Sequence, residues 1–113
     1  MTKDFHIGRN ALIFNLKGEI DQYAAAELKE RIDLEIENSP KRNLIIDLKN
    51  VELMDSSGIG LIVGRYKLVT SIGGQFAMCG GSDYVIKMLE LSGITKIIKH
   101  YKTITEAEKA FTL

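Results

Sequence analysis

The sequence predicts one α/β domain whose sheet is mixed but mostly parallel, with an antiparallel strand at its N-terminal edge and about four helices. Short apolar runs alternate with segments of helical periodicity, and the first two runs are joined by a tight-turn sequence. Strands that alternate with single helices favour right-handed crossovers between parallel strands. A chain of 113 residues can bury a core without disulfides or metal, so residues 1–113 are expected to form a single domain.

The N-terminal third predicts a hairpin followed by a helix. The runs 5–7 and 11–16 are apolar and flank Gly8-Arg9-Asn10, whose glycine and asparagine tolerate the positive φ of a tight turn. Asp21 can cap a helix that ends at residues 38–40, Asn-Ser-Pro. Within this helix the apolar residues recur at helical spacing, at Ala25, Leu28, Ile32 and Ile36.

The middle of the chain predicts a strand, a helix and another strand. Residues 44–48 form an apolar run typical of a buried strand, residues 57–71 are expected to be helical, and a strand at 75–79 follows a Gly-Gly break. The loops that leave the C-terminal ends of parallel strands gather on one edge of a sheet. We therefore expect Asp21 and the turn 55–57, Asp-Ser-Ser, to share that edge.

The C-terminal third predicts a short helix, a last strand and a terminal helix. Ser82 is expected to cap the short helix, and Gly93 to close it in a left-handed conformation. The last strand is expected at about 96–99. The terminal helix carries a capping-box pattern at 105–108, Thr-Glu-Ala-Glu.

Composition argues against several classes of function. Fifteen basic and fifteen acidic residues give no net charge, and no basic run exceeds the Lys41-Arg42 pair, so no direct nucleic-acid partner is expected. The one cysteine, Cys79, lies in an apolar run and is interpreted as a buried hydrophobe. No apolar stretch is long enough to span a bilayer, and residues 1–4 lack a signal-peptide core. We expect a cytoplasmic protein without a membrane partner.

No pattern in the sequence predicts an enzyme, a cofactor or a metal site. A serine hydrolase needs a base, but His6 lies on an edge strand, His100 lies near the C-terminus, and no Gly-x-Ser-x-Gly elbow is present. Gly58, Gly60 and Gly64 imitate a dinucleotide fingerprint, but the third glycine comes one place late. A small nucleotide-binding or hydrolytic protein that uses this turn remains the alternative from a different class.

Three consecutive cap-type residues, Asp55, Ser56 and Ser57, begin the central helix. They can be interpreted simply as helix caps, since their oxygens accept free backbone N–H groups. One cap is sufficient, so at least one hydroxyl is expected to stay free at the positive end of the helix. A phosphate fits there, and its charge beside Asp55 and Asp21 would switch off the binding of an acidic or closely fitted partner.

The same helix carries two apolar faces. One is expected to face the core and consists of Ile59, Ile62, Val63, Tyr66 and Val69. Leu61 and Leu68 lie roughly opposite it, with Arg65 alongside. This second ridge is either covered by a loop or forms a binding surface, and we favour binding because the ridge begins beside the free hydroxyls.

Four segments of the sequence resemble a known protein family. The segments VELMDSSGIGLIVGRYK (51–67), KGEID (17–21), SIGGQFAMCGGS (71–82) and MLELSGITKIIK (88–99) resemble the anti-sigma factor antagonists, single-domain members of the STAS family. The resemblance covers essentially the whole chain. The Asp-Ser-Ser-Gly signature, at the strand-to-helix turn that the family uses, is most similar to the sporulation branch, the sigma-F antagonists.

The resemblance implies a STAS-type fold and a partner-switching function. The unphosphorylated protein would bind an anti-sigma factor that is also a serine kinase and free the sigma factor, which promotes transcription. Phosphorylation would release it until a serine phosphatase resets it. The family's phosphoacceptor is the first serine after the aspartate, which is Ser56 here.

The resemblance also implies a partner-binding edge. It carries over onto Asp21, Asp55, Ser57, Gly58 and Ile59, and helix geometry adds Leu61 and Arg65; Ser57 is then interpreted as the structural cap. Residues 22–25, Gln-Tyr-Ala-Ala, depart from the histidines or threonine common in the sporulation branch. A general-stress antagonist or a STAS scaffold component therefore remains an alternative within the family.

Overall fold

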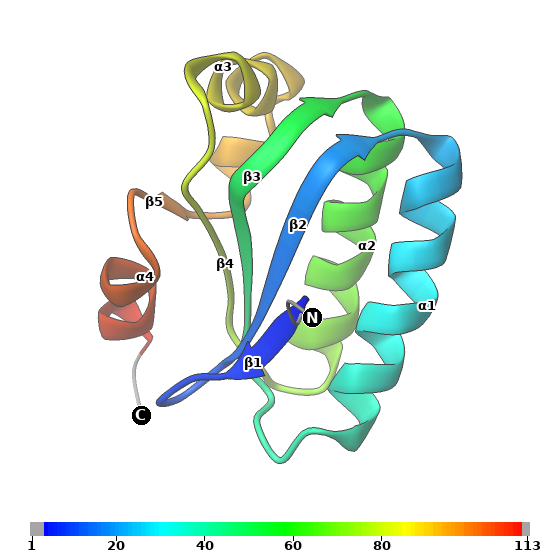
Figure 1. The fold of residues 1–113 in the computed structure, drawn as a ribbon. Coiled ribbons are helices and arrows are strands. Elements are labelled where there is room, and N and C mark those ends of the chain that lie inside the picture. Colours follow the sequence, from blue (N-terminus) through cyan, green and yellow to red (C-terminus); the bar gives the residue numbers. More distant parts are fainter. Residues whose placement is uncertain (1–3, 112–113) are drawn as a thin grey trace.

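The structure, a computed structural model, describes residues 4–111. In it α1, α2 and α3 contribute to the core on one face of a central sheet, and α4 packs against the other face (Figure 1). The strands are β1 (Phe5–Ile7), β2 (Leu12–Ile20), β3 (Leu44–Met54), β4 (Phe76–Cys79) and β5 (His100–Tyr101). The helices are α1 (Gln22–Asn38), α2 (Ser56–Ser71), α3 (Asp83–Ser92) and α4 (Ile104–Ala110), with a 3-10 turn η1 (Ile94–Lys96) after α3.

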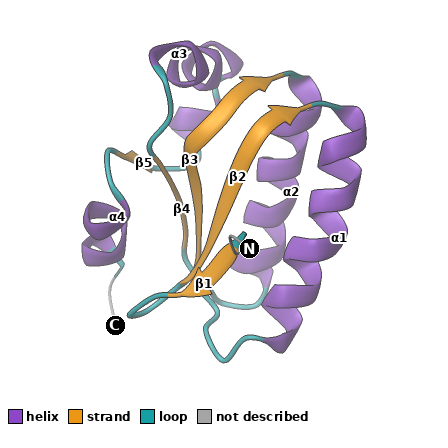
Figure 2. Cartoon of the chain, viewed as in Figure 1, coloured by secondary structure: helices purple, strands orange, loops and turns teal. Residues whose placement is uncertain are grey.

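The five strands follow one another across the sheet in chain order (Figure 2). β1 pairs with β2 antiparallel, and all the other pairs are parallel. Each parallel connection contains a helix, as parallel crossovers require. The predicted fold class is therefore confirmed, including the antiparallel strand at the N-terminal edge.

Both faces of the sheet are buried, which explains the unbroken apolar runs of the central strands. On β2, Leu12, Phe14 and Leu16 belong to the larger core cluster, which includes the buried residues of α1, α2 and α3. Ala11 and Ile13 point the other way into a smaller cluster that α4 completes with Ala107 and the following Phe111.

The two central strands are longer than the sequence predicted. β2 continues to Ile20 and β3 to Met54, although 17–19 and 49–53 contain polar residues. These extensions pair with each other, from Lys17 with Asn50 to Ile20 with Met54, and their polar side chains are exposed. Backbone hydrogen bonds between β2 and β3 hold these extensions in the sheet. The sequence did not predict them, because they lack the apolar pattern of a strand.

The C-terminal elements are shifted from their predicted places. Residues 94–96 form the turn η1, and the last strand is only His100–Tyr101, so the expected strand at about 96–99 is wrong. The cap of α4 is Thr103, whose Oγ1 accepts the N–H of Glu106 at 3.1 Å. The capping pattern thus begins two residues before the expected Thr105, because Thr103-x-x-Glu106 has the same spacing.

Candidate functional site

The candidate site lies where β2 and β3 end side by side. Ile20 is paired with Met54, and the N–H of Asp55 donates to the carbonyl of Ile20 at 3.4 Å. Asp21 and Asp55, the next residues on each strand, therefore stand next to one another, as predicted. Together with Glu19, Leu53 and Tyr84 they line a cavity of about 240 Å³.

Each of the two aspartates caps a helix. Asp21 Oδ1 accepts the N–H of Ala24 at 2.9 Å, and Asp55 Oδ1 accepts the N–H of Ser57 at 2.7 Å. Asp55 has an extended backbone and α2 begins at Ser56, one residue earlier than predicted. The interpretation of Ser57 as the structural cap is therefore wrong, because the carboxylate of Asp55 already satisfies the first turn.

The hydroxyl of Ser56 is left free by this arrangement. Ser56 is exposed, and its side chain makes no hydrogen bond to any other residue in the range 4–111. It occupies the first helical position of α2, at the positive end of the helix dipole. Ser57 is partly buried, so the more accessible of the two serines is Ser56.

Gly58 seats the first turn of α2 on the ends of the two strands. It is buried, and a Cβ at this position would collide with the side chain of Met54 and come within 3.2 Å of Ile20 Cγ2. Ile59, the next residue, is partly buried against the main core. The glycine therefore fixes how closely the turn that carries Ser56 approaches β2 and β3.

The expected second apolar ridge on α2 does not exist as an exposed surface. Leu61 is only 5% exposed and Leu68 is partly buried against the core. α1 packs alongside α2 on the same face of the sheet (Figure 1), which covers the side of α2 from which these leucines project. Leu61 is therefore a core residue, and the expectation of an exposed leucine ridge is wrong.

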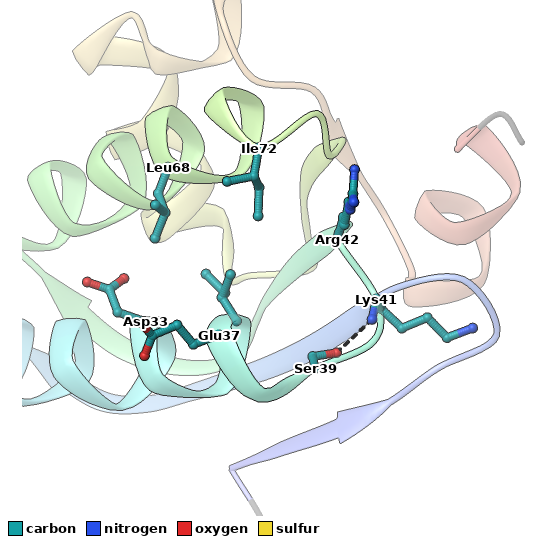
Figure 3. A pocket seen from close by; sticks show the side chains of 8 residues that line it. Asp33, Glu37, Ser39, Lys41, Arg42, Leu68 and Ile72 are labelled. Atoms are coloured by element: carbon teal, nitrogen blue, oxygen red, sulfur yellow. Dashed lines mark hydrogen bonds between the residues drawn. The ribbon is translucent and has the colours of Figure 1, made fainter.

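Leu68 instead lines a cavity of about 510 Å³ between the C-terminal halves of α1 and α2 (Figure 3). Leu68 and Ile72 form one wall and Asp33 and Glu37 the other, while Ser39 Oγ accepts the N–H of Lys41 at 3.0 Å below it. This cavity is remote from Ser56, because α2 spans roughly 24 Å at 1.5 Å per residue. It does not share any residue with the edge described above.

Arg65 is buried between the two helices. It is 6% exposed, and its Nε lies 2.7 Å from Oδ1 of Asp33 on α1. Neither atom has hydrogen-bond geometry to a partner, so the contact is a close ion pair. Lys29 approaches the same carboxylate, with Nζ 3.6 Å from Oδ2. Sequence reasoning missed Asp33, because its partner lies on another helix and no spacing within α1 marks it.

Within the described part of the chain, the two histidines do not lie in a cluster of metal-ligating or catalytic side chains. His6 is exposed on β1, and His100 Nε2 lies 2.7 Å from the carbonyl of Gly80. Across residues 4–111 no group of His, Cys, Asp and Glu could hold a metal ion. In the same range no helix is long and apolar enough to cross a membrane.

The fold, with an exposed serine and two aspartate caps at the ends of β2 and β3, can be compared with known proteins. The STAS domain profile matches residues 3–107, so the chain belongs to the STAS domain family. Within that family it belongs with the anti-sigma factor antagonists, which are regulatory proteins and not enzymes.

Two relatives show how the chain is placed within this group. The anti-sigma F factor antagonist of Paenibacillus polymyxa is 36% identical, over 88% of this chain and 89% of the relative. The anti-sigma-B factor antagonist of Bacillus subtilis (strain 168) is 35% identical, over 84% of this chain and 85% of the relative. The two identities are too close to separate the two kinds of antagonist.

Solved structures agree with the fold. The crystal structure of a Thermotoga maritima protein is similar with a TM-score of 0.85 at 30% identity, covering 93% of this chain and 90% of that one. The structure of the Bacillus cell fate determinant SpoIIAA in its phosphorylated form is similar with a TM-score of 0.68 at 25% identity, covering 93% and 96%.

Proposed function

We propose that this chain is a partner-switching protein and that Ser56 is its switch. The unphosphorylated form binds an anti-sigma factor that is also a serine kinase and so frees the sigma factor. Phosphorylation of Ser56 ends this binding, and a serine phosphatase restores it. The observation that carries the proposal is the exposed, unbonded hydroxyl of Ser56 on the first turn of α2, next to the carboxylate cap Asp55.

A phosphate on Ser56 changes the surface more than the fold. It adds nearly two negative charges at a helix N-terminus, where the helix dipole favours an anion. The same dianion stands beside the exposed Asp21 and Asp55, so a partner that is acidic or closely fitted here is repelled. The similarity to a Bacillus protein whose phosphorylated form has been solved supports this mode of regulation.

The proposed partner surface consists of Asp21, Asp55, Ser57 and Ile59 around Ser56, all of them exposed or partly exposed. Gly58 and Leu61 are buried, so they support this surface by packing. They do not need to touch the partner. Arg65 is also buried.

Modification of Ser56 can be tested directly. The chain is incubated with ATP and the anti-sigma kinase encoded nearest to its gene, and intact-mass spectrometry with fragment mapping locates the phosphate. We expect a single phosphate on Ser56 and loss of the complex on native gels. Ser56→Ala should bind but accept no phosphate, whereas the control Ser71→Ala, at an exposed serine at the other end of α2, should be phosphorylated normally. Full incorporation into Ser56→Ala would move the switch elsewhere.

The particular sigma factor is a finer part of the proposal. We favour a sporulation, sigma-F type partner because of the Asp-Ser-Ser-Gly turn and the relative from Paenibacillus polymyxa. The equally similar relative from Bacillus subtilis makes the general-stress type the second candidate. Calorimetric titration of this chain with anti-sigma F factor and with anti-sigma-B factor compares the two, and tighter binding to the latter would reverse our choice.

A further inference from the structure

Two glycines of α2 have no explanation within the chain. A Cβ at Gly60 or at Gly64 would meet no atom within 4 Å. Glycine in a helix interior is less favourable than alanine, because it has more backbone freedom to lose. Gly58, two residues before Gly60, is required by its contacts with Met54 and Ile20. Gly60 and Gly64 therefore lower the stability of the helix without a packing reason inside the protein.

These glycines line a groove between the two helices that lie side by side in Figure 1. The groove holds a cavity of about 250 Å³, and its walls come from both helices: Ala25, Ala26 and Lys29 of α1, and Gly60, Leu61, Gly64 and Arg65 of α2. Four of these seven residues are glycine or alanine. A backbone from outside could thus approach both helices closely.

The two glycines of the groove lie in a row with Ser56 on α2. Ser56, Gly60 and Gly64 follow one another at intervals of four residues, so they form a continuous row on α2. Ser56 and Gly60 are exposed and Gly64 is partly exposed. Anything that lies along this row therefore passes the hydroxyl of Ser56.

The charged residues that line the groove are both cations, Lys29 and Arg65. They share a single carboxylate, Asp33, so one positive charge is left over. Arg65 is 6% exposed and its Nε is buried without a hydrogen bond, and its guanidinium donates to no residue in the range 4–111. Because Arg65 and Lys29 are paired with the same Asp33 carboxylate, the positive charge left over on the wall of the groove favours a carboxylate from outside.

We infer that the α1/α2 groove receives a segment of the anti-sigma factor whose backbone packs against Gly60 and Gly64 and whose carboxylate pairs with Lys29 and Arg65. The inference rests on the proposed function and specifies the chemistry of its partner. It also explains the switch, because a phosphate on Ser56 would stand at one end of the groove and repel an acidic, closely packed segment. Larger side chains in place of Gly60 and Gly64 would also weaken binding, because they would fill the space that the segment occupies.

The first test separates the stability of the chain from its affinity. Gly60→Ala and Gly64→Ala fill open space, so each should raise the melting temperature by roughly 3 to 6 °C. Gly60→Leu should still fold because residue 60 is exposed, but it should weaken binding to the anti-sigma kinase encoded nearest to the gene by about tenfold or more. The control is Thr70→Leu, an exposed position near the far end of α2, which should bind as wild type.

The second test addresses the charge. Lys29→Glu should weaken binding by about tenfold, and Lys87→Glu, at an exposed position on α3 that does not line the groove, should not. Wild-type affinity in Gly60→Leu would overturn the groove, and wild-type affinity in Lys29→Glu would overturn the acidic segment. Wild-type protein that binds no anti-sigma factor would overturn the proposed function itself, a result distinguishable from the other two because it needs no variant.

Discussion

At the scale of single residues, Asp55 and Ser56 differ in their part at the start of α2. The carboxylate of Asp55 accepts the N–H of Ser57 at 2.7 Å and closes the first turn of α2. The hydroxyl of Ser56 is thereby released from any structural duty. A residue that is chemically modified during regulation is best placed where the fold does not depend on it.

This division predicts opposite outcomes for two neighbouring substitutions. Asp55→Ala removes the cap and should lower the free energy of unfolding by about 1 kcal/mol. Ser56→Ala removes a hydroxyl without a partner and should change it by less than about 0.5 kcal/mol. Urea unfolding followed by circular dichroism measures both. Equal losses in the two variants would mean that Ser56 also takes part in capping.

At the scale of elements, the position of α2 depends on Gly58 and not on Gly60 or Gly64. Gly58 lies against Met54 and Ile20, so it sets the distance between the helix and the ends of β2 and β3. Gly60 and Gly64 face open space. The same residue type therefore serves internal packing at Gly58 and lines open space two and six residues later.

Gly58→Ala tests the internal role. The added methyl group overlaps the buried side chain of Met54, and we expect a loss of about 1–3 kcal/mol in the free energy of unfolding from overpacking. The matched control is Gly60→Ala, which should gain about 0.5–1 kcal/mol from the alanine's helix propensity. Thermal unfolding of the two variants measures the contrast, and a stabilised Gly58→Ala would show that α2 can shift freely on the strands.

At the scale of the whole molecule, Cys79 links the stability of the sheet to pH. It is the last residue of β4, is 1% exposed and lies opposite Asp47 of β3. Burial, and then the neighbouring Asp47 carboxylate, raises the pKa of the Cys79 thiol to about 12 from an ordinary value of 9.0. The thiol therefore stays protonated in the folded protein under conditions in which it ionises in the unfolded chain.

The sign of the effect follows from this order of pKa values. Below about pH 9 the thiol is protonated in both states, and its contribution to stability is fully present. As the pH rises toward about 12 the unfolded chain loses the proton first, so stability falls. Urea unfolding at about pH 8 and about pH 10.5 should show a smaller alkaline loss in Cys79→Ala than in wild type. The same loss in both proteins would remove Cys79 as the cause.

Much of this architecture follows from the sequence by itself. Its apolar runs and helical periodicities predict the order of strands and helices. Because the C-terminal ends of parallel strands meet at one edge of a sheet, the sequence also correctly predicts that Asp21 lies beside Asp55. The buried state of Cys79 also follows from its apolar neighbours. These features are local or depend on rules of connection, which a linear pattern records.

The tertiary structure alone decided the rest. The sequence predicts Leu61 to be on an exposed ridge, but α1 covers it in the structure. It predicts Arg65 to be a partner-binding cation, but in the structure Arg65 is buried and paired with Asp33. The polar ends of β2 and β3 are strands only because each supplies the other's hydrogen bonds. The physical reason is the same in each case: periodicity reports which side of an element is apolar, whereas burial and pairing depend on a second element distant in sequence.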